Sequence, residues 1–515
     1  MSSIKSLLSL LPLLALVRGE SVDATLEGSA QNALTFAYQY GFPLTAYGQF
    51  VRKTGGSENV LHHNRALADS DFRAVVRPNV DTLYSSMFYD VSHHDLNITF
   101  PELEDRLWLF SFYDIYGNNF ANIGSLDAYS AGSYRVRQDA MDFGVSAEAT
   151  EGFLGQVNSP TPHGLLLVRT AVYQSDETYT TVHAFQDAID IQLAQRTSFP
   201  EKAPPKLDLA LFSDPRFNPE QKGTTLASAT LELLAFFHPI SPPRIAQDAA
   251  WIDTMLVRAG LSNGSFTQPD GTSLEGAAAL ANLTARASLN QAGFRQYLGS
   301  NWTLTAPDVS GDFGSFYNVR QKIAMDGYLM LTADQAIYPS YTAPDGAWEL
   351  EVGRDEAVLL TFKDKPFLVD TGFWSITLYG EDSYLIENDL RRYALSSRDN
   401  LTYPDGSLVR DGSGTDVPFQ VLIQPGGNSP PKNWTDNWVP GPRDGGKFTM
   451  HLRLYGAREE MLDGTYEYPT VTFVQALRED TEPIEATLWD QAWAQIRRVF
   501  GLLAGSSGEE YILDL

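Results

Sequence analysis

The hydrophobic pattern of this chain changes twice along its length, and these two changes limit the folds that it can adopt. Between about residues 72 and 185, short apolar runs alternate with turns rich in Gly, Pro, Asn and Asp, as expected for β-strands. From 190 to 335 the apolar residues recur at helical spacing, and from about 336 the strand pattern returns. Two β-rich regions that flank a helical one predict packed β-sandwiches and not a parallel sheet.

We therefore expect an α+β, β-rich fold with two sandwich-like or jelly-roll-like halves. A chain of 515 residues is long enough for several domains with a large core. The expected divisions are, in order, a signal peptide (1–19), an N-terminal β-rich domain (20–189), a mostly helical linker region (190–335), a C-terminal β-sandwich domain (336–480) and a C-terminal helix with a tail (481–515).

Individual strands and helices follow from the same patterns. Strands are expected at Thr82–Val91, Leu107–Phe112, Ser133–Val136, Gly164–Tyr173, Tyr179–Phe185, Ala357–Phe362, Phe367–Tyr379, Phe419–Gln424 and Phe448–Tyr455. Helices are expected at Leu34–Phe50, Thr224–Phe237, Pro242–Gly260, Leu274–Leu298 and Glu485–Leu503. Pro43 should break the first of these helices. In the strand Phe367–Tyr379, Trp374 should enter the core and Ser375 should face the opposite side.

The N-terminus has the pattern of a secretory signal. Lys5 supplies a positive charge, Leu7–Val17 forms an apolar run, and Val17-Arg18-Gly19 is a suitable cleavage site. The apolar run is shorter than the about 20 residues that a membrane-spanning helix needs. An uncleaved signal anchor is the alternative interpretation. We expect a secreted protein, in the extracellular space or the secretory pathway.

Six N-glycosylation sequons agree with export, and they lie at Asn97, Asn263, Asn282, Asn301, Asn400 and Asn433. The chain has no cysteine, so thiol nucleophiles and thiolate metal sites are excluded. A secreted chain of this size does not need disulfides, because its core is large enough to stabilise it.

The charge of the chain limits its partners. A formal net charge of −27 repels phosphate backbones and anionic membrane surfaces. The densest basic cluster is the single pair Arg391-Arg392, so we expect no nucleic-acid partner. After the N-terminal run, no stretch is apolar and long enough for a stable membrane span. The sequence does not determine the oligomeric state.

Several different polar groups meet at the start of the first expected strand. They are the side chains of Arg77, Asn79, Asp81 and Tyr84. Pro78 should hold Arg77 extended, and Arg77 can then pair with Asp81. A nearby cation lowers the pKa of an aspartate, so an ionised Asp81 could anchor a substrate hydroxyl or amine, or act as a weak base. The alternative is an ion pair that only locks the first strand.

Two further clusters follow strand ends. Asp114, Asn118 and Asn119 come after an apolar run, where sandwich folds often place ligand contacts, although turns also favour these residue types. In the C-terminal half the candidates are Arg392, Asn437 and Trp438. Because Trp438 stands between Asn437 and a proline, we expect an exposed aromatic platform that suits sugars or flat ligands.

No cofactor or metal signature accompanies these residues. The sequence has no H-x-H, H-E-x-x-H or EF-hand pattern, no nucleotide-binding fingerprint and no G-x-S-x-G elbow. His183 is expected to be a hydrogen-bonded core residue of a strand. A calcium site built from scattered Asp and Asn stays open. Carboxylate-pair chemistry also stays open, for instance between Asp81 and Asp114.

These motifs resemble those of a known family, the paired domains of unknown function numbered 1254 and 1214. The segment 77–91 and the loop after Tyr113 resemble the first domain. The segments FWSITLY, NDLRRYAL, DGSL, NWVP and FTMHLRLYG resemble the second. The resemblance implies a jelly-roll-like sandwich in each half, with helices between them, and implies no established activity. Ser125–Gly155 lacks the family's usual glycine- and proline-rich run, so we expect altered specificity there.

Our leading hypothesis is a secreted enzyme that acts on a small-molecule or carbohydrate-like ligand in a pocket between the two halves. Asp81 would be its acid/base or anchoring carboxylate, Arg77 would orient Asp81, and Trp438 would stack on the ligand. In a fungal-type secreted member, tailoring of a secondary metabolite is an equally open hypothesis. The other alternative is a non-catalytic binding or surface protein.

Overall fold

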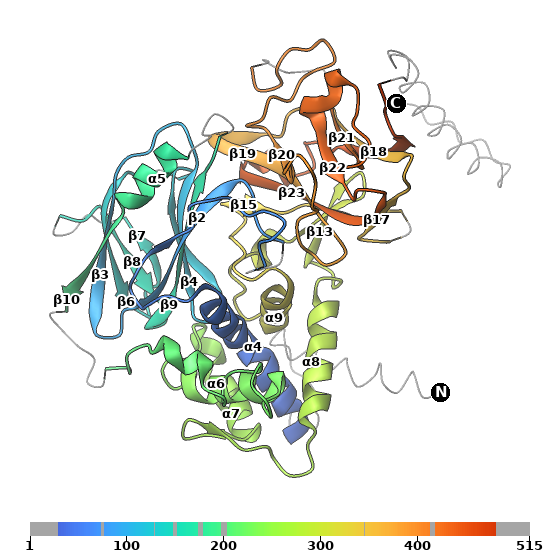
Figure 1. Ribbon diagram of the computed structural model, residues 1–515. Coiled ribbons are helices and arrows are strands. Elements are labelled where there is room, and N and C mark those ends of the chain that lie inside the picture. Colours follow the sequence, from blue (N-terminus) through green and yellow to red (C-terminus); the bar gives the residue numbers. More distant parts are fainter. Residues whose placement is uncertain are drawn as a thin grey trace, which may run out of the picture.

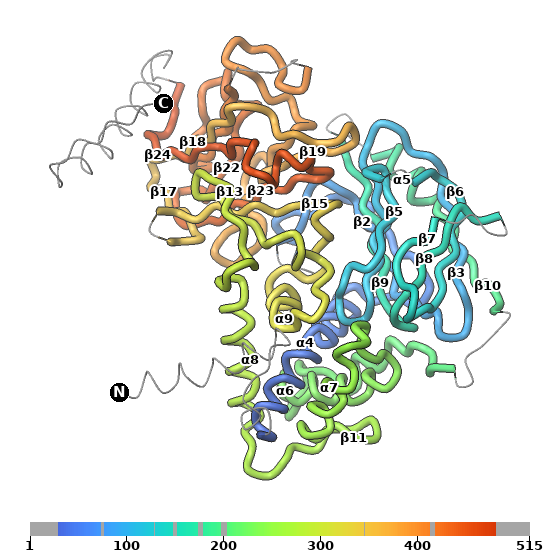
Figure 2. The backbone as a smooth tube through the Cα atoms, turned by 180° about the vertical axis from the view of Figure 1, so that it is seen from behind, coloured from blue at the N-terminus to red at the C-terminus, as the bar shows by residue number. Residues whose placement is uncertain are grey.

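The computed structural model describes residues 29–73, 77–127, 129–147, 152–173, 179–196, 203–344, 346–411 and 418–479. The predicted signal segment and the predicted helix Glu485–Leu503 lie outside these residues. Figure 1 shows two β-sandwiches side by side, with a group of helices beneath and between them. The view from behind in Figure 2 gives the same arrangement. The predicted β-rich α+β fold is confirmed.

Two sheets form the first sandwich, with strand orders β1-β2-β9-β4-β5 and β10-β3-β6-β8-β7. The strands are β1 (His62–His63), β2 (Thr82–Asp90), β3 (His94–Phe100), β4 (Trp108–Asp114), β5 (Asn119–Gly124), β6 (Gly132–Gln138), β7 (Gly144–Ser146), β8 (Gly155–Ser159), β9 (His163–Ala171) and β10 (Asp190–Gln195). In β9, Leu166 and Val168 face the core between the sheets, whereas Leu165 and Leu167 face the helices. Both faces of the first sheet are therefore covered, which explains the unbroken apolar run of residues 165–168 in β9.

The second sandwich pairs a large sheet around β23 with a smaller one of order β22-β21-β18-β24. The strands are β13 (Arg295–Gly299), β14 (Trp302–Thr305), β15 (Ala336–Ile337), β16 (Ser340–Tyr341), β17 (Leu350–Val352), β18 (Glu356–Phe362), β19 (Leu368–Tyr379), β20 (Ala394–Ser396), β21 (Phe419–Pro425), β22 (Trp438–Gly441), β23 (Gly446–Ala457) and β24 (Thr470–Gln475). Along β19, Trp374 and Ile376 enter the core, and Ser375 bonds Asp81 of the first sandwich. The predicted opposite faces of Trp374 and Ser375 are confirmed.

Most of the helices pack together on the outer face of the first sheet. The helices are α4 (Ala30–Thr54), α5 (Thr180–Asp187), α6 (Leu226–Phe237), α7 (Ala246–Arg258), α8 (Leu274–Ser288) and α9 (Tyr317–Asp326), of which α5 lies apart from the others (Figure 1). The helix α4 starts at Ser29, whose hydroxyl caps the N–H of Asn32. It continues through Pro43, so the prediction that Pro43 breaks this helix is wrong. Because α4 is buried against α6, α8 and α9, packing offsets the roughly 3 kcal/mol that an internal proline costs.

Two other elements differ from the sequence prediction. The segment expected as a strand at Tyr179–Phe185 is the helix α5, because Val182, Phe185 and Gln186 are buried at helical spacing. Consequently His183 lies on a helix, where its Nε2 donates to the carbonyl of Arg65 at 2.9 Å. The helix expected to reach Leu298 ends at Ser288, and β13 and β14 of the second sandwich follow it.

Candidate functional site

Asp81 lies at the boundary between the two sandwiches and is only 2% exposed. Its Oδ1 accepts a hydrogen bond from Nη2 of Arg398 at 2.5 Å, and its Oδ2 accepts one from Oγ of Ser375 at 2.5 Å. Ser375 belongs to β19, and Arg398 follows β20, so both partners come from the second sandwich. The carboxylate therefore links the two halves, and its counter-charge is Arg398 and not Arg77.

Arg77 does not have the extended backbone that Pro78 was expected to impose. Its φ is 51°, in the left-handed region, which costs a non-glycine residue about 1–2 kcal/mol. Two tertiary contacts hold this conformation: the N–H of Arg77 donates to the carbonyl of Ser383 at 2.9 Å, and its own carbonyl accepts from Nη2 of Arg453 at 3.1 Å. Contacts with the second sandwich thus override the local preference of the residue before proline.

Asn79 and Tyr84 occupy different environments. The Oδ1 of Asn79 accepts from the N–H of Asp81 at 2.6 Å, and its Nδ2 donates to the hydroxyl of Tyr455 in β23 at 2.7 Å. Asn79 therefore forms the turn that starts β2 and ties this turn to the second sandwich. Tyr84 is partly exposed on the outer face of the first sheet, where the guanidinium of Arg169 lies 5.5 Å from its ring centroid.

Asp114 lies far from Asp81. Thr82, the residue after Asp81, pairs with Ala171 of β9, whereas Asp114 pairs with Gly164 near the other end of the same strand. At about 3.3 Å per residue along β9, the two carboxylates are roughly 20 Å apart. A shared acid–base pair of Asp81 and Asp114 is therefore excluded.

The loop between β4 and β5 binds Asp114 through its own donors. The Oδ2 of Asp114 accepts from Nδ2 of Asn118 at 2.7 Å, and its Oδ1 accepts from the N–H of Tyr116 at 2.9 Å. Burial raises the pKa of Asp114, while the guanidinium of Arg244 opposes this shift. Asp114 and Asn118 are each at most 2% exposed, so they serve this tight loop.

Asn119, the next residue, reaches a pocket. Its side chain bridges β5 and the segment before β15: Oδ1 accepts from Nδ2 of Asn122 at 2.9 Å and from the N–H of Thr332 at 3.1 Å. These three residues form part of the wall of a pocket of about 730 Å³. The complete lining is Asn119, Phe120, Ala121, Asn122, Asp127, Tyr129, Ser130, Tyr134, Val145, Ala147, Leu154, Asp312, Thr332, Asp334 and Gln335.

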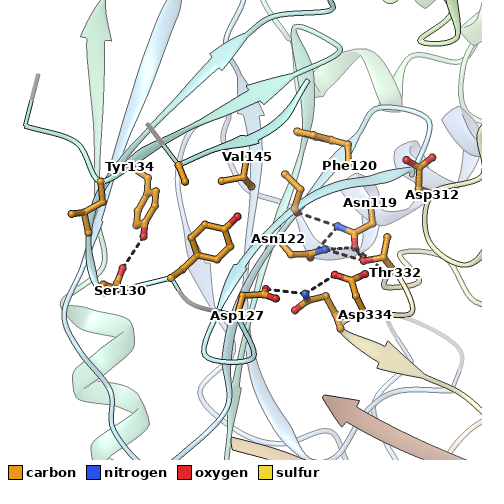
Figure 3. Close-up of a pocket in the computed structure, with 15 residues that line it drawn as sticks. Asn119, Phe120, Asn122, Asp127, Ser130, Tyr134, Val145, Asp312, Thr332 and Asp334 are labelled. Carbon is orange, nitrogen blue, oxygen red and sulfur yellow. Dashed lines mark hydrogen bonds between the residues drawn. The ribbon is translucent and has the colours of Figure 1, made fainter. Parts of the chain in front are cut away.

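Figure 3 shows how the polar groups are distributed in this pocket. Ser130 and Tyr134 lie on one side, and Asn119, Asn122 and Thr332 lie on the other. The lining comes from the first sandwich and from the chain that leads into the second one. Much of it belongs to Ser125–Gly155, the region in which altered specificity is predicted from the sequence.

Two carboxylates in the pocket share one amide nitrogen. The Nε2 of Gln335 donates to Oδ2 of Asp127 at 2.9 Å and to Oδ2 of Asp334 at 2.8 Å. Because the two hydrogens of an amide diverge by about 120°, these oxygens lie roughly 5 Å apart. Asp127 is exposed at one side, and the partial burial of its carboxyl group raises its pKa; the bond from Gln335 lowers this pKa, and the charge of Asp334 raises it. A third acid, Asp312, is neutralised by Arg244, whose Nη1 lies 2.8 Å from its Oδ2.

The candidates in the second sandwich do not reach this pocket. Trp438 is 4% exposed and packs in a small core with Leu359 and Leu422, so the prediction of an exposed platform is wrong. Its strand β22 runs parallel to β21, and this pairing turns the indole inward. The amide of Asn437 bonds Thr402 and the carbonyl of Gln420, and Nη1 of Arg392 donates to the carbonyl of Trp438 at 3.1 Å.

The sequons differ in accessibility. The side chain of Asn282 accepts from Gln321 at 2.8 Å, and Oδ1 of Asn97 is buried within the second sheet of the first sandwich. Asn301 is partly exposed. The exposed sequon residues are Asn263, Asn400 and Asn433. Glycosylation at these positions stays a prediction.

Within the described part of the chain, no three or more His, Asp or Glu side chains are grouped so that they could hold a metal ion. None of the helices in these residues is long and apolar enough to cross a membrane.

Sequence reasoning did not identify Asp127, Asp334 or Gln335. Asp127 stands in a turn, where aspartate is common for conformational reasons alone. Asp334 and Gln335 lie in the expected helical region and are distant from Asp127 in sequence. The predicted departure from the family pattern at Ser125–Gly155 was the one signal that pointed toward this pocket.

Two family models match the chain, both described as proteins of unknown function: DUF1254 over residues 58–193 and DUF1214 over residues 335–459. No curated protein matches this sequence. The solved structure of the VPA0106 protein from Vibrio parahaemolyticus is similar with a TM-score of 0.56 and 18% identity, over 87% of this chain and 100% of that chain. An uncharacterised protein from Burkholderia cenocepacia matches with a TM-score of 0.39 and 13% identity, over 91% of this chain and 93% of that chain.

The likeness to the Vibrio protein shows a shared fold. The two family models match in the expected order, one in each half of the chain. The first model covers the segment that starts at Arg77, and the second covers the strands β19 and β23 that meet it. This chain belongs to the family of proteins that carry the domains of unknown function DUF1254 and DUF1214 in tandem.

Proposed function

We propose that this protein is an enzyme that acts on a small carbohydrate-like molecule in the pocket whose lining includes Asn119 and Gln335. The observation that carries the proposal is the carboxylate pair Asp127 and Asp334, held by one amide at the wall of a pocket of about 730 Å³. This volume lies within the roughly 300–1,000 Å³ range of small-molecule sites.

The polar lining favours a ligand rich in hydroxyl groups. Carboxylates and amides accept hydrogen bonds from hydroxyls, and amides also donate them. The rings of Tyr129 and Tyr134 add flat apolar surface against which a sugar ring can pack. Asp127 and Asp334 have no cation among the lining residues, so the pocket disfavours an anionic ligand.

The pair can supply acid–base chemistry to a glycosidic bond. Carboxyl groups about 5–5.5 Å apart are typical of retaining hydrolysis. Asp127, whose pKa is raised by burial, would protonate the leaving oxygen while Asp334 attacks the sugar carbon and the glycosidic bond breaks. Water, deprotonated by Asp127, would then release the sugar from Asp334. Gln335 would position both carboxylates through its shared amide.

The test is a screen of chromogenic glycosides with four proteins: wild type, Asp127→Asn, Asp334→Asn and Asp270→Asn. Asp270 is an exposed residue outside the pocket, so its variant is a control for the same loss of charge. We expect hydrolysis of at least one glycoside by wild type and by the Asp270 variant, with a loss of at least 100-fold in kcat for the two pocket variants. Added azide should restore part of the Asp334→Asn activity, because a small nucleophile replaces the lost carboxylate.

A non-catalytic binding protein would behave differently. It would bind sugars in calorimetry, and neither wild type nor any variant would release the chromophore. Hydrolysis that survives equally in both pocket variants would overturn the assignment of the carboxylates. Secretion stays a prediction and does not enter this test.

A further inference from the structure

At the boundary between the two sandwiches, one buried cation has no anionic partner among the described residues. Arg169 of β9 is 4% exposed. Its Nη1 donates to Oγ of Ser111 at 3.1 Å, and its Nη2 donates to the hydroxyl of Tyr113 at 3.2 Å and the carbonyl of Leu329 at 3.3 Å. Within the described residues, no carboxylate forms an ion pair with this guanidinium. All the partners of Arg169 are neutral.

A second cation, Arg453 of β23, approaches the boundary from the other sandwich and is 6% exposed. It donates to Oγ1 of Thr377 at 2.8 Å, to the hydroxyl of Tyr379 at 2.5 Å and to the carbonyl of Arg77 at 3.1 Å. Neither Arg453 nor Arg77 has an ion pair in the part of the chain that the structure describes. Asp81, whose charge acts on Arg453, is already paired with Arg398.

Both guanidiniums act on the same two tyrosines. Arg169 and Arg453 each lie close enough to Tyr338 and Tyr455 to lower the pKa of both phenols. The pairing of β15 with β23 places Ala336 opposite Tyr455, two residues before Tyr338. Tyr338 and Tyr455 pack in one cluster with Leu109 of β4, which pairs directly with Arg169, and Tyr455 lies two residues from Arg453 on β23, so this cluster adjoins both cations.

The tyrosines do not neutralise these cations at neutral pH. Burial is the largest influence on the pKa of Tyr338 and Tyr455, and it raises both well above the usual value for a phenol. Both phenols are therefore protonated at pH 7. A buried guanidinium that lacks an anionic partner is costly, and a bound anion removes this cost.

Unused hydrogen-bond donors lie beside these cations. Tyr84 and Tyr338 are partly exposed, and their hydroxyls form no hydrogen bond within the described residues. Nε of Arg77 is buried and also has no partner. The aromatic surroundings favour a flat, singly charged anion, because the cost of desolvation rises steeply with charge.

We propose that this boundary binds a small organic carboxylate, with its negative charge between Arg169 and Arg453 and within reach of the hydroxyls of Tyr84 and Tyr338. This site is separate from the acidic pocket, because none of its residues lines that pocket. It also selects an anion, the ligand charge that Asp127 and Asp334 disfavour in the acidic pocket. The proposal therefore does not depend on the proposed hydrolysis.

The experiment uses benzoate as the probe, titrated calorimetrically into the full chain at pH 7. Benzamide, its neutral analogue, and inorganic phosphate are the comparison ligands. We expect benzoate to bind at least tenfold more tightly than benzamide or phosphate. Arg169→Gln should abolish benzoate binding. Tyr84→Phe and Tyr338→Phe should each weaken it about tenfold to a hundredfold, since each removes one hydrogen bond to a charged group.

One control variant and the two tyrosine variants complete the test. Tyr297→Phe, at an exposed tyrosine of β13, should leave the affinity unchanged. If Arg169→Gln does not fold, the tyrosine variants decide, because they keep the rings and remove only hydroxyls. Equal binding of benzoate and benzamide, tighter binding of phosphate, or loss of benzoate binding in Asp127→Asn would each overturn the proposal. The last result would also place the anion in the acidic pocket.

Discussion

Replacing Asp81 with asparagine should weaken the contact between the two sandwiches by about 3 kcal/mol. The substitution removes the counter-charge of Arg398, whose side chain is 10% exposed. Removing one partner of a buried ion pair costs about 3–5 kcal/mol. We expect the lower end of this range, because Arg398 keeps the carbonyl of Val172 as an acceptor and lies 4.0 Å from the ring centroid of Phe373.

Two assays measure this effect. Scanning calorimetry should show a lower midpoint of unfolding, and hydrogen exchange should rise in β19 and β20, which carry or precede the partners of Asp81. The matched control is Asp370→Asn, at an acid that is fully exposed and lies 3.8 Å from Arg458. This control should leave both measurements unchanged, because exposed ion pairs contribute little.

One result would contradict the assigned role of the ion pair. A change below about 1 kcal/mol in Asp81→Asn, with unchanged exchange in β19, would mean that Arg398 finds a full replacement for the carboxylate. Arg398→Met separates the two explanations. If the ion pair carries the stability, Asp81→Asn combined with Arg398→Met should be less damaging than the sum of the two single changes.

Two further predictions concern Gly117 and His451. Gly117→Ala should destabilise the protein by about 1–3 kcal/mol in calorimetry, because a Cβ would lie 2.8 Å from the ring of Tyr328. The control Gly264→Ala has a similar φ of 76° and open space around it, so it should destabilise the protein less. Equal losses of stability in the two variants would refute the packing argument. The pKa of His451 is lowered below its usual 6.5 by burial and by the charges of Arg453 and Arg77. On acidification the unfolded chain therefore protonates this histidine before the folded protein does, so the stability of the fold should decrease as the pH drops below about 6.5. His451→Asn should make this loss between pH 7 and 5 smaller, as measured by thermal unfolding, and an unchanged pH dependence would contradict it.

Local patterns were sufficient for most strands of the fold. The alternation along β19 predicted which side chains enter the core, because successive residues of a strand point to opposite faces. The failures have physical causes. At Pro43 burial against three helices outweighs a local cost, and at Arg77 two contacts from the second sandwich outweigh the preference of a residue before proline.

The contacts of the candidate site were harder to predict than the strands, because the residues that form each contact are far apart in sequence. Asp81 bonds Arg398 across 317 positions, and Asp127 meets Gln335 across 208 positions. Short motifs show which residues can do chemistry, but they do not show which distant residue will neutralise a charge. Of the predicted ligand residues, Asn119 lines the pocket, whereas Asn118, Asn437 and Trp438 are buried in structural contacts.

The link between Asp81 and Arg398 also has a consequence for synthesis on the ribosome. The first sandwich is complete once β10 has emerged, yet the partners of Asp81 lie in residues 375 and 398. At about 5–20 residues per second, the stretch from the end of β10 at Gln195 to Arg398 takes roughly 10–40 s to make. During that interval the nascent sandwich presents Asp81 and Arg169 on a face that the finished protein buries. The burial of this face therefore has to wait until the second half of the chain has been made.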